Sequence, residues 1–332
     1  MFGRLKDRIL LEQRVRKGRK LAATSTARIA VFHDFAPPPT GGGHQFLRAL
    51  MAEWKRMGIE VVVNALPEST EAVLINSYNF SPDLLRRLDD REVRIVHRVD
   101  GPLQVYRGFD DGTDLEIARL NREFSSASIF QSEFSRSEND RLGFGLLPGP
   151  VICNAADREI FRPRGDEVPQ ADRRLRVMAA SWSNNPNKGL DVYRWIDENL
   201  DPELYEFTFV GRAQMEFRRF RHVPALPSDQ LAALMRENDV FLTASLNDPC
   251  SNSVVEALTV GLPCLYRKSG GHSELVGEGG IGFDRAEEIP GKLETVARDW
   301  ESCAEKIRVP SIREVAERYL EVLEVHPQVH RR

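Results

Sequence analysis

The chain alternates short apolar runs with longer stretches in which apolar residues recur every three or four positions. A short apolar run bounded by turn residues predicts a buried strand, and the wider spacing predicts a helix with one apolar face. Strands are expected in the first half at 28–32, 59–63, 72–75, 93–96 and 127–131. Helices are expected between them at 44–57, from Ser81 onward, at 113–125 and at 133–142. This alternation is typical of a doubly wound α/β sheet.

The same alternation resumes after an interruption rich in proline and charge between residues 147 and 174, which predicts a domain boundary. Further strands are expected at 175–181, 206–210, 239–243 and 262–266, and a last helix at 311–326 with Ser311 as its N-cap. We therefore predict a basic N-terminal segment (1–27), two Rossmann-like domains (28–152 and 153–310) and a C-terminal helix and tail (311–332). A ligand is expected in the cleft where both sheets present their carboxyl-end loops.

Length and composition agree with two water-soluble cores. The chain has 332 residues, 41% of them hydrophobic, and lacks an apolar stretch of the roughly 18 residues that a membrane span needs. Its net charge of −4 gives no reason to expect a nucleic-acid partner. The four cysteines have neither zinc-site spacing nor an obvious disulfide framework, and the start lacks a secretory signal, so we expect a cytoplasmic protein.

Positive charge is concentrated at the N-terminus, where residues 1–20 hold eight Lys or Arg against Asp7 and Glu12. Phe2, Leu5 and Ile9 fall on one helical face, but polar residues interrupt this face from Glu12 onward. Two interpretations remain open: the segment contacts anionic lipid head groups at the inner membrane face, or it is a solvated helix that lies against the body.

The most informative motif is the segment from Asp248 to Glu256, between a predicted strand and a predicted helix that starts near Ser251. The first turn of a helix presents unpaired backbone N–H groups and the positive end of its dipole, which suits a diphosphate. Glu256 lies more than one turn into this helix, where its carboxylate can accept hydrogen bonds from two adjacent hydroxyls, such as those of a ribose.

This segment resembles the E-x7-E signature of the family-4 retaining glycosyltransferases of the GT-B fold, with Asp248 and Glu256 in the two acidic places. The resemblance implies two Rossmann-like domains facing a cleft, with a C-terminal helix that crosses back to the first domain. It also implies that Glu256 binds the donor ribose and that Asp248 faces the donor sugar. The amides that would approach the donor phosphates are those of Ser251, Asn252, Ser253 and Val254.

Other segments between about residues 28 and 283 are similar to the same family. Lys188 of AsnLysGly (187–189) corresponds to the lysine that neutralises the pyrophosphate, and Gly270 and Gly271 to the glycine pair that closes over the donor. Gly42 and Gly43 correspond to the glycine-rich loop beside the donor phosphates. Further similar segments are 209–211, 130–135 and 151–157. In HisArgValAspGly (97–101), His97 would reach the donor sugar and Asp100 would lie on the acceptor side.

One position departs from the family pattern. The family places an arginine five residues before the phosphate lysine, and this chain has Ser183 there. Losing a bidentate arginine weakens stabilisation of the leaving nucleotide. Arg212, directly after the strand ending at 211, is the candidate to replace it.

The resemblance implies a retaining transfer from a UDP- or GDP-linked sugar to a hydroxyl of a glycan or lipid-linked acceptor, in polysaccharide, lipopolysaccharide or other glycoconjugate synthesis. No metal or other cofactor is expected, because positioning and electrostatic stabilisation would supply the catalysis. Two alternatives stay open. One is an epimerase or hydrolase on the same fold, and the other is a catalytically silent nucleotide-sugar-binding protein, which Ser183 favours.

Overall fold

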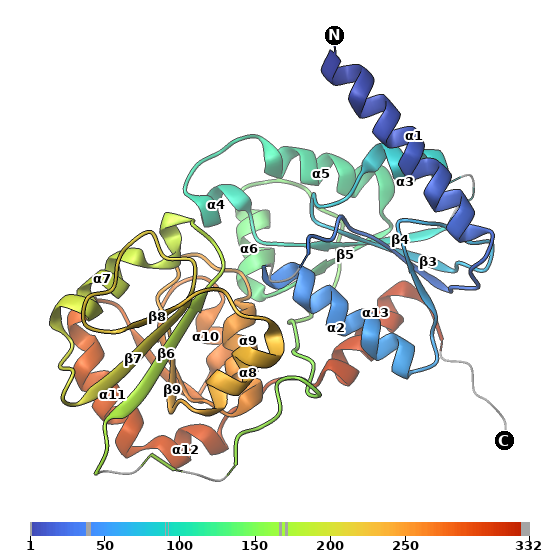
Figure 1. Ribbon diagram of the computed structural model, residues 1–332. Helices are drawn as coiled ribbons and strands as arrows, with labels where there is room; N and C mark the ends of the chain where they lie inside the picture. The colour runs from blue at the N-terminus through green and yellow to red at the C-terminus, as the bar shows by residue number, and fades with distance from the viewer. Residues whose placement is uncertain are drawn as a thin grey trace, which may run out of the picture.

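The computed structural model describes residues 2–37, 41–89, 91, 93–165, 168–169 and 172–326, which form two parallel β-sheets flanked by helices (Figure 1). The outermost parts of the predicted N-terminal segment and C-terminal tail, residues 1 and 327–332, lie outside the described residues. Each sheet has helices on both faces, so its strands are buried and their sequences are apolar runs rather than alternating patterns.

The first sheet has the strand order β2-β1-β3-β4-β5, and every pairing in it is parallel. The strands are β1 (Ile29–Phe32), β2 (Val61–Val63), β3 (Ala72–Asn76), β4 (Arg94–Val99) and β5 (Ala127–Phe130). The chain moves from β1 outward to β2 and then returns to the other side of β1 to form β3. A ligand crevice is expected at such a switch point, outside the carboxyl ends of β1 and β3.

Three helices of the first half, those that start at Pro82, Thr113 and Glu133, begin where the sequence signals indicated. The helix at Gly42 begins two residues earlier than predicted, and the short helix at Leu103 was not predicted. The helices of this half are α1 (Phe2–Ala22), α2 (Gly42–Arg56), α3 (Pro82–Leu88), α4 (Leu103–Arg107), α5 (Thr113–Phe124) and α6 (Glu133–Arg141). The Ser81 side chain caps α3 by accepting a hydrogen bond from Leu84 N, and Pro82 occupies the first turn. The apolar face of α2, which includes Phe46, Leu50 and Trp54, packs into the core of this half.

The second sheet has the strand order β11-β10-β9-β6-β7-β8 and is also parallel. Its strands are β6 (Leu175–Ser181), β7 (Tyr205–Gly211), β8 (Arg221–Val223), β9 (Val240–Thr243), β10 (Cys264–Arg267) and β11 (Gly280–Phe283). The short edge strands β8 and β11 were not among the predicted strands, because one is exposed and polar and the other is rich in glycine. The switch point lies between β6 and β9, so the loops after these two strands face the crevice.

The remaining helices lie in the second half of the chain, and all but the last surround the second sheet (Figure 1). They are α7 (Leu190–Asn199), α8 (Ser228–Arg236), α9 (Asn252–Val260), α10 (His272–Val276), α11 (Ile289–Arg298), α12 (Trp300–Glu305) and α13 (Ile312–Leu323), with short 3₁₀ turns at Pro186–Lys188 and Ala286–Glu288. Helix α9 is almost entirely buried from Val254 to Val260, which explains its uninterrupted apolar sequence around Glu256.

The last helix returns to the first domain, as predicted (Figure 1). In α13 the side chains of Val315, Tyr319 and Leu323 are buried in the core that α2 also fills. The Trp54 indole Nε1 donates a hydrogen bond to Ala316 O at 3.2 Å. The predicted N-cap is confirmed, because Ser311 and Glu314 form a reciprocal capping box. The chain therefore crosses between the domains twice.

Candidate functional site

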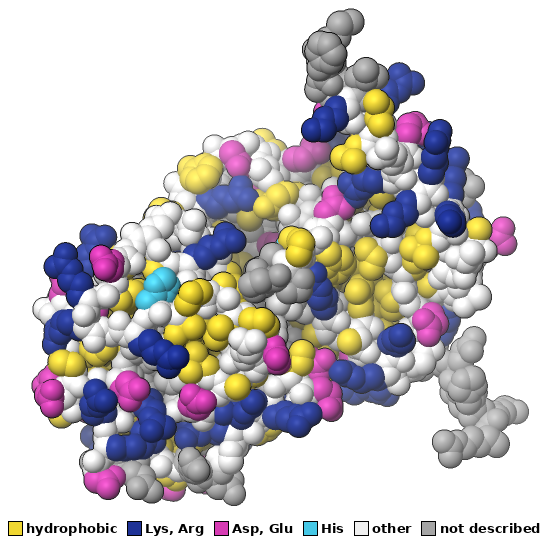
Figure 2. Space-filling model, viewed as in Figure 1, with side chains coloured by type: hydrophobic (Ala, Val, Ile, Leu, Met, Phe, Trp, Pro, Cys, Tyr) yellow, Lys and Arg dark blue, Asp and Glu magenta, His cyan; other side chains and the backbone are white. Residues whose placement is uncertain are grey.

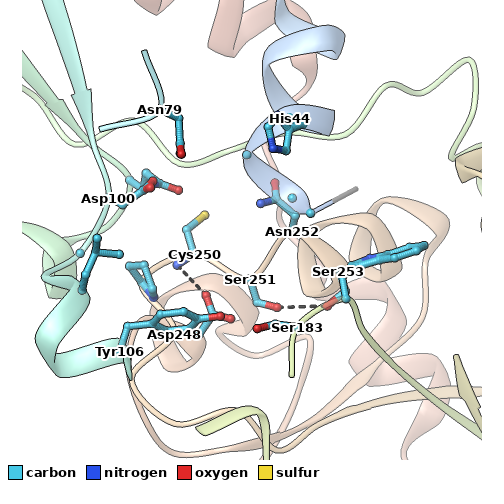
Figure 3. Close-up of a pocket in the computed structure, with 18 of the residues that line it drawn as sticks. His44, Asn79, Asp100, Tyr106, Ser183, Asp248, Cys250, Ser251, Asn252 and Ser253 are labelled. Carbon is cyan, nitrogen blue, oxygen red and sulfur yellow. Dashed lines mark hydrogen bonds between the residues drawn. The ribbon is translucent and has the colours of Figure 1, made fainter. Parts of the chain in front are cut away.

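The two switch points face each other across one cavity of about 350 Å³. The first domain contributes the start of α2, the ends of β1 and β3, and the Asp100–Gly101 turn after β4. The second domain contributes the residues after β6 and the loop from Asp248 to Ser253 that leads into α9. Figure 3 shows polar side chains from both domains directed into this space. We call it the larger cavity.

Hydrogen bonds connect the two domains on both sides of this cavity. Asn185 and Asn187 each donate a side-chain hydrogen bond to Tyr106 O, at 3.0 and 2.8 Å. On the other side, the Glu274 carboxylate accepts hydrogen bonds from the backbone N–H groups of Glu133 and Phe134 at the start of α6. A carboxylate at this position satisfies unpaired donors of the first helical turn and complements the helix dipole.

Lys188 and Asp248 form an ion pair on the second-domain wall of the larger cavity, with 2.6 Å between Lys188 Nζ and Asp248 Oδ2. Burial by itself would lower the pKa of Lys188, but the Asp248 carboxylate outweighs it and the pKa lies above its ordinary value. Burial would raise the pKa of Asp248, yet Lys188 and His272 together keep it below its ordinary value. Both groups are therefore charged at neutral pH. The ammonium also lies 5.0 Å from the ring centroid of Tyr106.

The start of α9 presents backbone donors to the larger cavity. Ser251 occupies the N-cap position, but its side chain makes no capping hydrogen bond and pairs instead with Ser253 Oγ at 3.1 Å. The N–H groups of the first helical turn have no acceptor within a helix. Ser251, Asn252 and Ser253 line the larger cavity, whereas the Val254 side chain is buried in the core. The loop geometry thus suits an anion at this helix start.

Gly270 and Gly271 pack against the backbone of Asp248 and Pro249 in the loop before α9. They do not line the larger cavity, contrary to their expected position over the donor. A Cβ atom on Gly270 would lie 2.4 Å from Asp248 O, and one on Gly271 would lie 2.3 Å from Pro249 O. Gly271 N donates to Asp248 O at 2.9 Å. The glycine pair is required because two backbone segments pass too closely for side chains between them.

The glycine-rich loop meets the α9 start from the opposite side. Gly42 and Gly43 both line the larger cavity, and Gly42 is in contact with Asn252. A Cβ atom on Gly42 would lie 2.2 Å from Asn252 Nδ2, whereas one on Gly43 would have no neighbour within 4 Å. Asn252 Oδ1 also accepts a hydrogen bond from Asn154 Nδ2 at 3.1 Å. The starts of α2 and α9 therefore converge at Asn252.

Glu256 lines a second cavity of about 220 Å³, which we call the smaller cavity. Its walls come from α2, from residues 155–161 and from Ser228 at the start of α8. Asn252 lines both cavities, so the α9 start lies between them. Burial raises the pKa of Glu256 to about 8, and its Oε2 atom has no hydrogen-bond partner. A buried carboxyl oxygen without a partner is costly and indicates a site completed by a ligand donor.

His97 does not reach the larger cavity, and the expectation that its ring contacts a donor sugar is wrong for this arrangement. The side chain is fully buried in β4, where Nε2 is 2.8 Å from Ser77 O and Nδ1 is 3.2 Å from Asn121 Nδ2. Burial lowers the pKa of His97 to about 4. The residue is the fourth of a six-residue strand, and the strand alternation points its ring into the core rather than toward the carboxyl end.

Asp100, the residue directly after β4, does line the larger cavity. Its Oδ1 accepts hydrogen bonds from Arg98 Nη1, at 3.2 Å, and from Gln131 Nε2. Arg98 is fully buried beneath it. The carboxylate is therefore fixed on the first-domain wall, opposite the α9 start (Figure 3).

Arg212 does not line the larger cavity. It lines a neighbouring pocket of about 20 Å³ that shares Ser181, Ser183 and Lys188 with the larger one. The Arg212 side chain is exposed, and its backbone N–H continues the pairing of β7 with β6 by donating to Ser181 O. In this arrangement Lys188 is the cation that borders the α9 loop directly.

Two histidines of the larger cavity were missed in the sequence. His33 follows β1 and His44 is the third residue of α2, and His33 Nε2 lies 2.8 Å from His44 Nδ1. The sequence signals were their positions, directly after a predicted strand and directly after three glycines. Tyr106 of α4 was also missed, because the short helix that carries it has no strong periodicity.

The described residues were also compared with the requirements of a metal site and of a membrane-spanning helix. Within residues 2–37, 41–89, 91, 93–165, 168–169 and 172–326, no cluster of three or more His, Cys, Asp or Glu side chains could hold a metal ion. In the same residues, no helix has the length and apolar character that a bilayer-spanning helix needs.

Comparison with known proteins identifies the second domain by sequence. Residues 218–308 match the family model of glycosyl transferases group 1. This match includes the whole segment from Asp248 to Glu256 and the glycine pair at 270–271. No curated protein matches the chain.

Solved structures resemble the whole fold. Sucrose-phosphate synthase from Thermosynechococcus elongatus aligns with a TM-score of 0.66 at 13% identity, over 90% of this chain and 94% of that one. Anabaena HepE in complex with UDP and glucose aligns with a TM-score of 0.65 at 15% identity, over 90% and 99%. The catalytic domain of starch synthase IV from Arabidopsis thaliana, bound to ADP and acarbose, gives 0.63 at 13% identity, over 89% and 98%. The predicted two-domain GT-B fold is confirmed.

Proposed function

Since this chain is a glycosyltransferase of the GT-B fold whose residues 218–308 match group 1, we propose that it transfers a sugar from a UDP- or GDP-linked donor to a hydroxyl acceptor. The transfer retains the anomeric configuration and needs no metal ion. The main observation in support is the start of α9. It has no side-chain cap, and it lies between two cavities that are both lined by Asn252.

A nucleotide sugar has three chemically different parts, and this region offers a suitable environment for each. The nucleoside would occupy the smaller cavity, where Glu256 lacks a partner for Oε2 and a ribose hydroxyl would supply one. The diphosphate would lie against the N–H groups of Ser251 to Val254. The sugar would extend into the larger cavity beside Asp248 and Lys188.

The leaving diphosphate develops negative charge, and Lys188 lines the larger cavity together with the loop at the start of α9. In the unliganded protein its charge is balanced by Asp248. Preorganised donors in a partly buried site stabilise developing charge more than the same groups in water. The lysine and the α9 amides would therefore supply the stabilisation that an arginine at position 183 would otherwise provide.

The acceptor would approach from the first-domain wall, where Asp100 is held by Arg98 and Gln131. Asn79 and Tyr78 line the same side of the larger cavity. Attack from the face that the nucleotide leaves accounts for retention, and the leaving phosphate would accept the hydroxyl proton. Comparison supports the donor class, since the HepE structure contains UDP and glucose.

Calorimetry with UDP, GDP and ADP tests the donor site first. One of these should bind, and Glu256→Gln should weaken it about 10- to 150-fold, because hydrogen bonds to a charged group contribute about 1.5–3 kcal/mol. Turnover with the matching nucleotide sugar and an acceptor panel should persist in EDTA. NMR should show the same anomeric configuration in product and donor. Unchanged binding by Glu256→Gln, or an inverted product, contradicts the proposal.

A catalytically silent nucleotide-sugar-binding protein is the second candidate. It is favoured by Ser183 at the family arginine position and by the placement of Arg212 outside the larger cavity. Tight nucleotide binding without transfer to any acceptor in the panel would support this candidate over the first. Sugar transfer by the wild-type protein that Lys188→Met abolishes would exclude it.

We also propose that α1 contacts anionic lipid at the cytoplasmic face of a membrane, as would suit a lipid-linked or cell-envelope polysaccharide acceptor. From residue 11 onward α1 packs on the body, with Val15 buried and Glu12 paired with Arg87. Residues 6–10 are exposed, and Ile9 and Leu10 there are 51% and 54% exposed. Figure 2 shows Lys and Arg side chains gathered along α1, with apolar ones among them.

Flotation with vesicles tests this contact without removing the buried part of the helix. The Ile9→Ser/Leu10→Ser variant should float less with phosphatidylglycerol vesicles than the wild type, because apolar insertion and charge attraction act together. Leu21→Ser, which changes an exposed apolar residue at the other end of α1, is the matched control. Equal flotation of all three proteins contradicts the membrane contact.

A further inference from the structure

A chain of buried polar groups connects Arg98 in the first-domain core to the wall of the larger cavity. Arg98 Nη1 donates to Asn76 Oδ1 at 2.6 Å, and Asn76 Nδ2 lies 3.5 Å from His33 Nδ1. His33 Nε2 lies 2.8 Å from His44 Nδ1. Arg98, Asn76 and His33 are each at most 1% exposed, so these side chains are almost entirely enclosed by protein. His44, which is half-buried, is the most exposed member of the chain and lines the larger cavity.

The direction of these hydrogen bonds follows from donor chemistry. A guanidinium group has only donors, so the Asn76 atom facing Arg98 is the carbonyl oxygen. The Asn76 amide group then faces His33 Nδ1 with its own N–H. A proton on His33 Nδ1 would place two donors against each other, so Nδ1 carries the lone pair. Neutral His33 therefore has its proton on Nε2.

The tautomer of His33 determines the tautomer of His44. Because His33 Nε2–H donates, His44 Nδ1 is the acceptor, and the proton of neutral His44 resides on Nε2. Both rings are neutral near pH 7, since burial lowers the pKa of His33 to about 3 and also lowers the pKa of His44. His44 therefore presents an N–H donor rather than a lone pair to its surroundings.

The position of His44 indicates what this donor meets. It is the third residue of α2, two positions after Gly42, which touches Asn252 at the start of α9. Figure 3 shows the His44 ring on the α2 side of the pocket, close to Asn252. The positive ends of two helices of 15 and 9 residues meet there. An anionic oxygen is the acceptor that fits a donor in this environment.

We propose that His44 Nε2–H donates a hydrogen bond to a diphosphate oxygen of the bound nucleotide, and that His33 and Asn76 are positioning residues that set its tautomer. The inference rests on the proposed nucleotide site and adds to it a donor from the first domain. The diphosphate would thus be held from both domains, and the bond would form only when the cleft is closed. His33 and Asn76 border the larger cavity but are each only 1% exposed, so they act through His44.

Nucleotide binding separates this contact from a structural role. His44→Phe keeps a ring without the donor and should weaken binding of the preferred nucleoside diphosphate about 10- to 150-fold, with binding of the corresponding nucleoside unchanged. His44→Gln, which retains an N–H group at a similar distance, should recover part of the loss. His326→Phe, at an exposed site near the C-terminus, is the matched control.

The possible outcomes are distinguishable. If the wild type binds none of UDP, GDP and ADP, the proposed function itself fails. If the wild type binds but His44→Phe binds equally well, only the His44 contact fails. An equal loss for nucleoside and nucleoside diphosphate would show that His44 shapes the pocket without meeting the diphosphate, and would overturn the contact as well.

Histidine nitrogen-15 shifts test the positioning residues directly in the full-length protein. In the wild type, His33 and His44 should both be protonated at Nε2 and unprotonated at Nδ1. Asn76→Asp replaces the amide donor with an acceptor, so His33 should gain a proton on Nδ1 and nucleoside diphosphate binding should change. A wild-type His44 protonated at Nδ1 alone would overturn the proposal, whatever the binding results.

Discussion

Lys188 Nζ and Asp248 Oδ2 are 2.6 Å apart, and this pair joins the turn after β6 to the loop after β9. The two residues come from different sequence motifs, yet the structure makes them one unit at the crevice of the second sheet. Their side chains are 19% and 8% exposed, so each charge depends on the other for its stability in the unliganded protein.

Removing one member of this pair should therefore destabilise the fold. Lys188→Met leaves the Asp248 carboxylate buried without its cation, which should lower the free energy of unfolding by about 3–5 kcal/mol. Urea denaturation provides the measurement. The double variant Lys188→Met/Asp248→Leu lacks both charges of the pair. Its free energy of unfolding should therefore fall by much less than the sum of the two single-variant decreases. Additive losses would contradict a coupled pair.

Glu256 should make the unliganded protein less stable as pH rises. Its pKa is about 8 in the folded protein and 4.5 in a model peptide, so between these values the folded state holds a proton that the unfolded state has lost. Stability therefore falls as pH rises from about 4.5 to 8. Glu256→Gln should remove this part of the dependence and be more stable than the wild type at pH 9. Coinciding stability–pH curves would contradict the assignment.

The same carboxyl group should release a proton when nucleotide binds near pH 7, because ribose hydroxyls donate to the ionised form. Calorimetry in two buffers of different ionisation enthalpy measures this release. The wild type should show fractional proton release that Glu256→Gln lacks. An identical buffer dependence of the two proteins would argue that the ribose does not reach Glu256.

The glycine-rich loop should tolerate a methyl group at one position and not at its neighbour. Gly42→Ala places Cβ 2.2 Å from Asn252 Nδ2 and 2.7 Å from Asn252 Cβ, and overpacking of this kind costs about 1–3 kcal/mol. Gly43→Ala meets no atom within 4 Å and should be neutral or stabilising by about 0.4–1 kcal/mol. Denaturation compares the two variants directly. A similar effect at both positions would show that the Gly42–Asn252 contact is absent in solution.

His97 should govern acid stability rather than donor binding. Burial lowers its folded-state pKa to about 4, so between pH 6.5 and 4 the unfolded state binds a proton that the folded state does not. Stability is therefore lost as pH falls through this window. His97→Gln should reduce that slope. His33, His44 and His272, whose pKa values burial also lowers, contribute to the slope that remains. Nucleotide affinity at pH 7 should be nearly unchanged. A decrease in nucleotide affinity as large as that of Glu256→Gln would instead indicate that His97 contributes to binding of the nucleotide sugar.

Much of the fold could be predicted from local sequence. Strands β1, β3 and β9 are short apolar runs that are buried on both faces. Such a run can be recognised in the sequence without knowing which strands pair with it. Helix starts at Ser81 and Ser311 were predictable because a cap depends on residues three positions apart. The edge strand β8 was not, since its exposed polar sequence is a strand only through its pairing with β7.

The candidate site divides in the same way. The sequence by itself determined that Asp248 and Glu256 flank a helix start, because strand, turn and helix there are local features. Only the tertiary structure decided that Glu256 lines one cavity and Asp248 another, that Lys188 pairs with Asp248, and that His44 rather than His97 faces the cleft. The physical reason is that these relationships depend on how two sheets and the returning helix α13 pack together, and packing is decided by contacts between residues far apart in the chain.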